Sequence, residues 1–172
     1  MTVRRAARED IPLIRSMADV AFRDTYRDIL SPDQMEYMLD WMYSETSLER
    51  QMGSDGHIYF IAESDEGEPF SYFSVQPLGR QEDDAYLFEL QKLYLLPEWR
   101  GKGLGGKLFN YVLQFAKDAA EGQPCRIQLH VNRYNSRAVA MYRHYGMEVL
   151  VEADFPIGKG YYMNDYVMGK AF

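Results

Sequence analysis

Cysteine, positive charge and long apolar runs are all scarce in this sequence of 172 residues. The single cysteine, Cys125, excludes an internal disulfide framework and a cysteine-rich zinc site, and it fits a reducing compartment. The 19 Lys and Arg residues face 26 Asp and Glu residues, which gives a net charge of −7. Because phosphate binding depends on clustered Lys and Arg, this balance argues against a nucleic-acid partner and favours cationic small molecules as ligands.

The apolar residues are also distributed in a way that argues against a membrane protein. No apolar run approaches the roughly 20 residues that a membrane helix requires, and the N-terminal stretch "MTVRRAARED" has no apolar signal core. We therefore expect a cytoplasmic protein without a membrane partner. The chain also contains no internal repeat, low-complexity tract or linker, and 47% of its residues are hydrophobic. This predicts one domain that covers residues 1–172.

Two hydrophobic periodicities divide the chain. Apolar residues between positions 9 and 51 recur at helical spacing, with one break at "LSPDQ", where Ser31 can cap and Pro32 can open a second helix. Strand-like segments follow: "HIYFIAE" and "PFSYFSVQP" as a hairpin, residues 86–96 as a third strand, and "CRIQLHV" after a helix. Asn135 can cap another helix. The segments "MEVLVEADF" and "GYYMNDYVM" predict a final hairpin. This order predicts an α/β (α+β) fold with a mixed, mostly antiparallel sheet of about seven strands flanked by helices.

The stretch "EWRGKGLGGKLF" packs four glycines just before a predicted helix. Its letters satisfy the G-x-x-x-x-G-K pattern of a nucleotide P-loop, but Leu108 stands where that site needs a Ser or Thr hydroxyl. They also satisfy the dinucleotide fingerprint G-x-G-x-x-G, but the next strand ends in His130, Val131 and Asn132 and supplies no carboxylate for a ribose. A third alternative is a plain glycine-rich connector that lets the helix pack closely.

A fourth interpretation rests on Arg100, Gly103 and Gly105, spaced as [RQ]-x-x-G-x-[GA]. Together with its surroundings, "LQKLYLLPEWRGKGLGGKLF" resembles the acyl-CoA-binding segment of the GNAT (GCN5-related) N-acetyltransferase superfamily. Downstream, "NSRAVAMYRHYGMEV" resembles the second signature of that superfamily, with Met147 where an aromatic residue usually follows the glycine. The resemblance covers Tyr86 to Val149 and implies an acetyl-CoA-dependent N-acetyltransferase that uses no metal.

The resemblance also implies which residues contact acetyl-CoA. The pantetheine arm is expected to lie along the strand at Leu93, Tyr94 and Leu95, and Asn135 and Tyr142 are expected to contact the cofactor. The diphosphate suits a helix N-terminus, where unpaired N–H groups carry positive partial charge and glycines permit close approach. The residues expected at the diphosphate are Arg100, Gly101, Lys102, Gly103, Leu104, Gly105, Gly106 and Lys107.

Acetyl transfer to an amine needs a proton acceptor for the amine and a proton donor for the departing thiolate. Glu89 occupies the place where many members of the superfamily carry a catalytic carboxylate, and strand alternation puts it on one face with Gln91 and Leu93. We expect Glu89 to act as the base, directly or through a water. Tyr142 matches the tyrosine that protonates the sulfur in many relatives. The alternatives are a solvated glutamate and a tyrosine that only packs.

The acceptor is indicated by an acidic segment between Asp24 and Glu49, in which seven carboxylates and one arginine are interspersed with aromatic residues. The stretch "FRDTYRD" at its start resembles bacterial diamine or polyamine acetyltransferases. The acidic segment predicts a small polycationic amine held through Tyr26, Asp28 and Trp41. An acidic solvated helix face would explain the same charges. Alternatives for the function are acetylation of a protein N-terminus or lysine, and a non-catalytic acyl-CoA-binding module. The three histidines show no metal-ligand spacing. Exposed sheet edges or the final hairpin would allow a homodimer.

Overall fold

The structure is a computed structural model that describes residues 1–172. Its elements are, in chain order, β1 (Thr2–Arg5), the short 3-10 helix η1 (Arg8–Asp10), α1 (Ile11–Tyr26), α2 (Pro32–Tyr43), α3 (Glu45–Met52), β2 (Ile58–Glu63), β3 (Pro69–Arg80), β4 (Tyr86–Leu95), η2 (Pro97–Trp99), α4 (Leu104–Ala119), β5 (Cys125–Asn132), α5 (Ser136–His144), β6 (Glu148–Gly158) and β7 (Tyr161–Ala171).

The chain divides into two compact units: Met1–Gln76 with Gln91–Gly105, and Pro77–Leu90 with Gly106–Phe172. The strands β3 and β4 run through both units. The strand order is β1-β2-β3-β4-β5-β7-β6, and β4 and β5 form a parallel pair in this seven-stranded sheet. The predicted α/β fold with a mixed, mostly antiparallel sheet is therefore confirmed.

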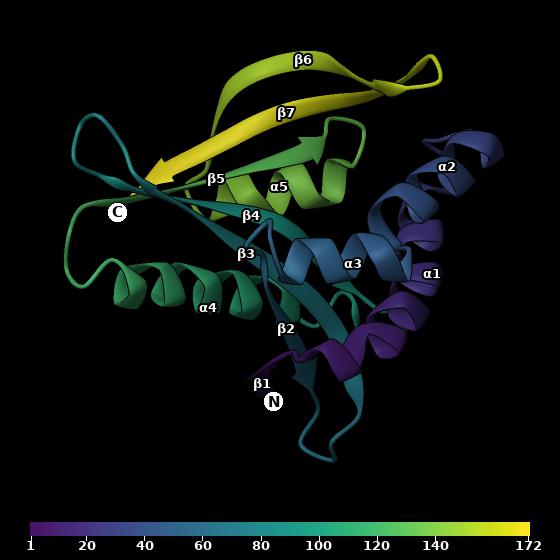
Figure 1. The fold of residues 1–172 in the computed structure, drawn as a ribbon, viewed down its shortest axis with the longest axis horizontal. Coiled ribbons are helices and arrows are strands. Elements are labelled where there is room, and N and C mark those ends of the chain that lie inside the picture. Colours follow the sequence, from purple (N-terminus) through teal and green to yellow (C-terminus); the bar gives the residue numbers. More distant parts are fainter. The chain divides into compact units, whose positions relative to one another are not determined.

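The first unit combines the N-terminal helices with β1 and β2 (Figure 1). The strand β2 pairs antiparallel with both β1 and β3, as the predicted hairpin requires. In α1, residues three and four positions apart such as Ile14, Ala18 and Ala21 are completely buried, because this spacing puts them on one helical face. The prediction that Ser31 caps the next helix is confirmed, since its side chain accepts a hydrogen bond from the Gln34 backbone N–H.

The N-terminal helical layer contains one helix more than the sequence predicts. The expected second helix ends at Tyr43, and α3 begins after Ser44. Ser44 has an extended backbone (φ −60°, ψ 152°), and its side chain accepts a hydrogen bond from the Ser47 backbone N–H. A serine that bonds to the backbone in this way ends one helix and caps the next without disturbing the apolar periodicity. The prediction of two helices over residues 9–51 was wrong for this reason.

The second unit places α4 and α5 with β5, β6 and β7. The helix α4 buries one apolar stripe, which includes Leu108, Phe109 and Val112. The strand β7 pairs antiparallel with β5 and with β6, so the predicted C-terminal hairpin is confirmed. In Figure 1 this hairpin is the long ribbon drawn in green and yellow.

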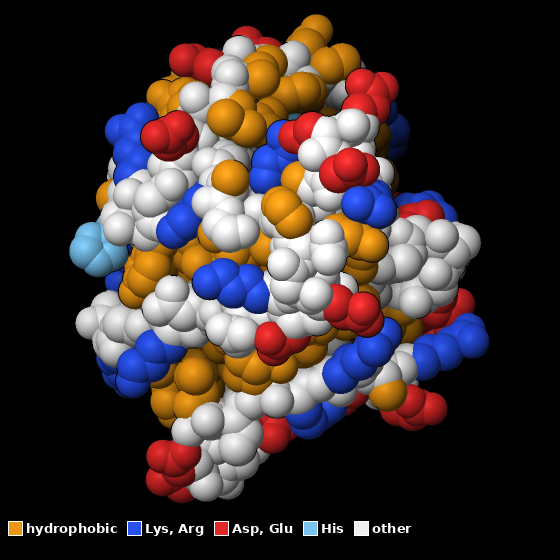
Figure 2. Space-filling view, turned by 90° about the vertical axis from the view of Figure 1, so that its left-hand side faces the viewer, with side chains coloured by type: hydrophobic (Ala, Val, Ile, Leu, Met, Phe, Trp, Pro, Cys, Tyr) orange, Lys and Arg blue, Asp and Glu red, His pale blue; other side chains and the backbone are white.

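The surface charges are mixed on the face drawn in Figure 2. Acidic and basic side chains alternate there with hydrophobic ones, and neither sign forms a continuous patch. The negative excess of the chain is therefore not gathered on this face. No helix in the structure is both long and apolar enough to cross a membrane.

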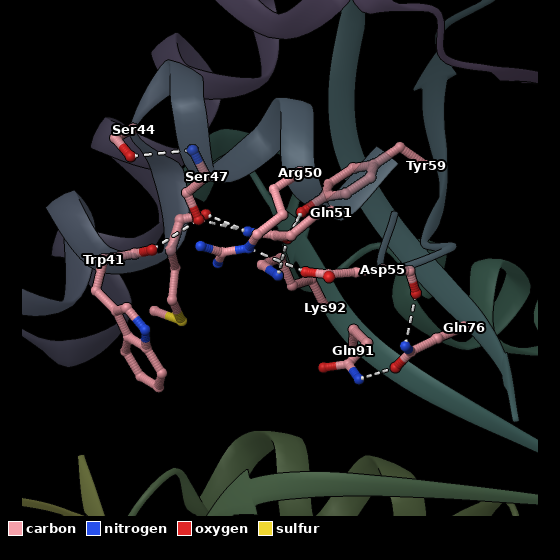
Figure 3. Close-up of polar contacts among 11 residues, drawn as sticks. Trp41, Ser44, Ser47, Arg50, Gln51, Asp55, Tyr59, Gln76, Gln91 and Lys92 are labelled. Atoms are coloured by element: carbon pink, nitrogen blue, oxygen red, sulfur yellow. Dashed lines mark hydrogen bonds and ion pairs between the residues drawn. The ribbon is translucent and has the colours of Figure 1, made fainter. Parts of the chain in front are cut away.

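A buried polar network joins the N-terminal helices to two strands of the first unit (Figure 3). The side-chain oxygen of Gln51, Oε1, accepts hydrogen bonds from the Tyr59 hydroxyl at 2.6 Å and from Lys92 Nζ at 2.8 Å. The Gln51 amide nitrogen donates to the Ser47 hydroxyl and to the Met42 carbonyl oxygen. All polar atoms of the Gln51 side chain are thus satisfied, which is the condition for burying an amide at little cost.

Lys92 is the one member of this network that can carry a charge. Its ammonium group lies 5.6 Å from the centre of the Tyr59 ring, and no carboxylate is paired with it. Burial disfavours the charged form and lowers the pKa of Lys92 to about 7. The amine is therefore largely neutral when the protein is folded at slightly alkaline pH.

We expect this buried amine to make the stability of the protein rise with pH between about 7 and 10. In that range the unfolded chain binds a proton at Lys92 that the folded chain does not. One such proton raises the free energy of unfolding by about 1.4 kcal/mol per pH unit. The Lys92→Met substitution should remove this slope, because methionine has no group that titrates. The Gln51 side-chain oxygen keeps the hydrogen bond from Tyr59 in this variant. Urea unfolding of both proteins at several pH values measures the difference, with the exposed Lys107→Met as control. Equal slopes in the wild type and K92M would contradict the prediction.

Candidate active site

The loop that joins β4 to α4 has the backbone form that the glycine pattern predicts. Gly101 and Gly103 have φ values of 76° and 75°, in the left-handed region that glycine adopts without a steric penalty. A Cβ atom at Gly103 would meet no other atom within 4 Å, so the space above this residue is open. The helix α4 begins directly afterwards, and the N–H groups of its first turn have no partner within the helix. This part of the chain fits an anionic group such as the diphosphate of coenzyme A.

Arg100, which the sequence analysis assigns to the diphosphate, is engaged within the protein. Its guanidinium forms an ion pair with Asp24 of α1 and donates to the carbonyl oxygens of Leu95 at 3.1 Å and Ala21 at 3.2 Å. A fourth bond reaches the Thr25 hydroxyl at 3.2 Å. The side chain therefore ties the end of β4 to α1 and has its charge balanced by Asp24. Lys102, whose ammonium lies 4.8 Å from the centre of the Trp99 ring, is a nearby cation that carries no ion pair.

The strand β4 offers an open edge at the positions predicted for the pantetheine arm. It pairs with β5 only over Tyr86–Leu90, so β5 does not continue along the positions predicted for the pantetheine arm. Within this stretch the Leu95 carbonyl oxygen accepts a hydrogen bond from Arg100. The other side is occupied, since the Leu96 N–H donates to the Phe70 carbonyl oxygen and the Ser71 hydroxyl donates to the Tyr94 carbonyl oxygen. An unpaired strand edge can hydrogen-bond an extended amide-containing chain as an added strand would.

The predicted base lies in the second unit beside a histidine, His130, that is not among the predicted site residues. The side chain of Glu89 is 15% exposed, and its Oε1 lies 3.7 Å from His130 Nε2. On the other side of the imidazole, Nδ1 lies 3.6 Å from Asp165 Oδ2. Asp165 is 2% exposed, and this oxygen accepts no hydrogen bond. A carboxylate, an imidazole and a second carboxylate therefore follow one another in a row.

The neighbouring carboxylates change the titration of His130. The interaction with Asp165 raises its pKa above the ordinary value, the charge of Glu89 acts in the same direction, and partial burial opposes both. In the sequence, His130 stands out only as a potential metal ligand and as part of the end of a strand. The signal that would have found it is strand register, which a single sequence does not contain.

Tyr142 and Asn135 belong to α5 and to its N-terminal cap. The Asn135 side chain accepts a hydrogen bond from the Ala138 backbone N–H at 3.3 Å, so its predicted capping role is confirmed. Tyr142 is 7% exposed, and its ring meets the Phe109 ring edge to face, with 5.4 Å between the centres. The residue is thus held firmly by packing. Its predicted role toward the sulfur stays a prediction.

The three residues predicted for the acceptor all lie in the first unit. Tyr26 is buried, and its hydroxyl lies 3.1 Å from the hydroxyl of Tyr94, which brings a predicted acceptor residue next to a predicted cofactor residue. Asp28 is exposed. Trp41 is 42% exposed and stacks on Tyr37 at 6.5 Å between ring centres.

The carboxylates of the acidic segment fall into two groups. Asp24, Glu36 and Glu49 are engaged by arginines. The carboxylates that form no ion pair in the structure are Asp28, Asp33, Asp40 and Glu45. No three His, Cys, Asp or Glu side chains are grouped so that they could hold a metal ion.

The comparisons with known proteins identify the family. A model described as the acetyltransferase (GNAT) family matches residues 17–147, so the chain belongs to this family of acetyl-CoA-dependent N-acetyltransferases. The uncharacterized N-acetyltransferase YjgM of Escherichia coli is 37% identical over 103 residues, which cover 60% of this chain and 56% of that protein. The matched part thus spans little more than half of that relative.

Two solved structures share the fold over almost the whole chain. The PaiA N-acetyltransferase of Thermoplasma acidophilum, in complex with coenzyme A, has a TM-score of 0.77 at 22% identity and covers 99% of this chain and 98% of that one. The spermidine/spermine N-acetyltransferase SpeG of Vibrio cholerae has a TM-score of 0.67 at 18% identity, with coverages of 99% and 92%.

Gly106 has a packing role that separates it from the other glycines of the loop. A Cβ atom here would collide with the hydroxyl and ring of Tyr145, because the tyrosine lies directly against the bare backbone of α4. We expect Gly106→Ala to lower the free energy of unfolding by about 1–3 kcal/mol, since it overpacks a close contact. Adding Tyr145→Ala should make the loss smaller than the sum of the two single losses. Urea unfolding of the four proteins measures this; strictly additive losses would contradict the contact.

Proposed function

We propose that this protein transfers an acetyl group from acetyl-CoA to a primary amine of a small polycationic, polyamine-like molecule. The observation that carries the choice of acceptor is the set of carboxylates without an ion pair on and around α2, the helix that also carries the exposed ring of Trp41. Ammonium groups are attracted both to carboxylates and to the faces of aromatic rings. The spermidine/spermine acetyltransferase with the same fold is compatible with this choice. The proposal takes residues 1–172 as one acetyltransferase domain.

Acetyl-CoA supplies the acetyl group in activated form, as a thioester. The residues proposed to hold it are those of the open β4 edge, Leu93, Tyr94 and Leu95, and those of the glycine loop and the first turn of α4. Main-chain groups provide most of this binding. Lys102 and Lys107 add positive charge, and Arg100 positions the loop through its bonds to α1. Asn135, as the N-terminal cap of α5, orients the helix that carries Tyr142.

The reaction requires that a C–N bond forms, a C–S bond breaks and two protons move. In the proposed mechanism Glu89 accepts the proton of the attacking amine, directly or through a water. Tyr142 gives its hydroxyl proton to the departing sulfur. A tyrosine suits this role because its ordinary pKa of about 10 is close to that of an alkyl thiol.

A homodimer is part of the proposal only as an expectation. The strand β6 is the last strand of the sheet, and it exposes apolar side chains, with Leu150 59% and Val151 48% exposed. An exposed apolar edge strand is a suitable surface for pairing with a second copy.

The choice of acceptor is tested with a panel of amines and a thiol-detecting assay. We expect spermidine and related polyamines to release coenzyme A faster than monoamines or an N-terminal peptide do. Asp28→Asn should raise the KM for spermidine about two- to fivefold, as expected for one exposed charge pair, and Trp41→Ala up to about tenfold. Glu82→Gln, at an exposed carboxylate of the second unit, is the control. Preference for the peptide would contradict the proposed acceptor.

The role of Tyr142 is tested by removing only its hydroxyl. Tyr142→Phe keeps the ring that packs on Phe109, and we expect it to lower kcat about 100-fold because a positioned acid is lost. The affinity for acetyl-CoA, measured by calorimetry, should change little. Tyr134→Phe, at an exposed tyrosine, serves as the matched control. Full activity of Y142F would remove this residue from the mechanism.

A further inference from the structure

Three adjacent strands of the second unit place Glu89, His130 and Asp165 on one face of the sheet. Glu89 pairs with Gln128, two residues before His130 on β5. His130 in turn pairs with Val167, two residues after Asp165 on β7. Because side chains two residues apart on a strand share a face, the register alone aligns the three titratable groups.

The three side chains are buried to different degrees, and Asp165 is the most buried of them. The side chain of Asp165 is 3% exposed, that of Glu89 15% and that of His130 33%. A buried carboxylate without a compensating charge is costly, so Asp165 needs the positive charge of the imidazole. Glu89 is the more exposed of the two carboxylates and lies on the Nε2 side of the ring.

The charged groups that act on His130 are Glu89 from β4 and Asp165 from β7. From β6 the uncharged ring of Phe155 approaches, with 5.0 Å between the ring centres. Both carboxylates stabilise the imidazolium, so His130 keeps its positive charge to a higher pH than an ordinary histidine.

We propose that His130, anchored by Asp165, is a positioning residue that holds the Glu89 carboxylate in place as the proton acceptor for the amine. This inference rests on the proposed function. The imidazolium attracts the Glu89 carboxylate and limits its rotation, and the Asp165 carboxylate attracts the ring from its Nδ1 side. When His130 loses its proton, this attraction disappears and Glu89 is free to turn away from the amine.

The electrostatic part is tested without any substrate, by following the ring protons and nitrogens of His130 by NMR as the pH is changed. We expect Asp165→Asn to lower the pKa of His130, because the buried negative charge is removed at nearly constant shape. Glu89→Gln should lower it less. The signals of His144, an exposed histidine on α5, should titrate alike in all three proteins. An unchanged His130 titration in D165N would overturn the inference.

The functional part is tested by the pH dependence of kcat/KM for the best amine. His130→Gln should lower it about tenfold below the pKa of the wild-type His130, because one nearby charge is lost. At higher pH the ratio of wild type to H130Q should fall towards one, since the wild type then lacks the charge too. In D165N the fall should begin at a lower pH. The KM for acetyl-CoA should not change in H130Q, and His144→Gln is the matched control.

The outcomes separate this inference from the proposed function. Turnover that E89Q abolishes but H130Q leaves unchanged at every pH overturns the positioning role alone. If the ratio of kcat/KM between wild type and H130Q is above one but the same at every pH, the effect of His130 is merely structural, and the positioning role is overturned as well. Absence of turnover with every amine overturns the proposed function and this inference with it. Thermal unfolding of H130Q and D165N establishes that both variants are folded.

Discussion

Main-chain groups where the β4–β5 pairing ends and in the first turn of α4 are the constraint on which the proposed cofactor site of this protein depends. The strand β4 loses its β5 partner after Leu90, and the loop that follows turns through two left-handed glycines into the first turn of α4. Such groups are costly unless water or a ligand bonds to them. An extended amide chain that ends in a diphosphate offers partners for both parts. A chain with a net charge of −7 can thus bind an anion, because peptide dipoles act locally and add nothing to the net charge.

This arrangement works only if the loop is held in place, and Arg100 explains how. A guanidinium has five N–H donors in a fixed plane, so it can bond several oxygens at once. Arg100 uses them on α1 and on the end of β4. A lysine at this position would supply the charge but not this set of bonds. The position of the arginine in the motif is therefore explained at least by the bonds that hold the loop.

Much of the fold could be predicted from the sequence because the deciding signals are local. The caps at Ser31 and Asn135 and the two hairpins all follow from neighbouring residues. The second break, at Ser44, was missed because the apolar spacing continues through it and only a side-chain hydrogen bond marks it. His130 and Asp165 were missed for a different reason. They are far apart in sequence, and only the pairing of β5 with β7 brings them together. Likewise, the Arg100 partner Asp24 lies on a distant helix.

The two faces of β4 carry ionisable side chains in different surroundings, which explains why the proposed reaction uses only one of these faces. On one face Lys92 is buried without a carboxylate, and desolvation lowers its pKa to about 7. On the other face Glu89 lies beside His130, whose positive charge is supported by two carboxylates. Burial alone removes a charge, whereas pairing preserves it. The Lys92 amine is buried against Gln51 and Tyr59. The preserved charges lie where the imidazole is still partly exposed, and a proton acceptor has to be accessible. The same strand therefore uses one charged residue for packing and another for the proposed reaction.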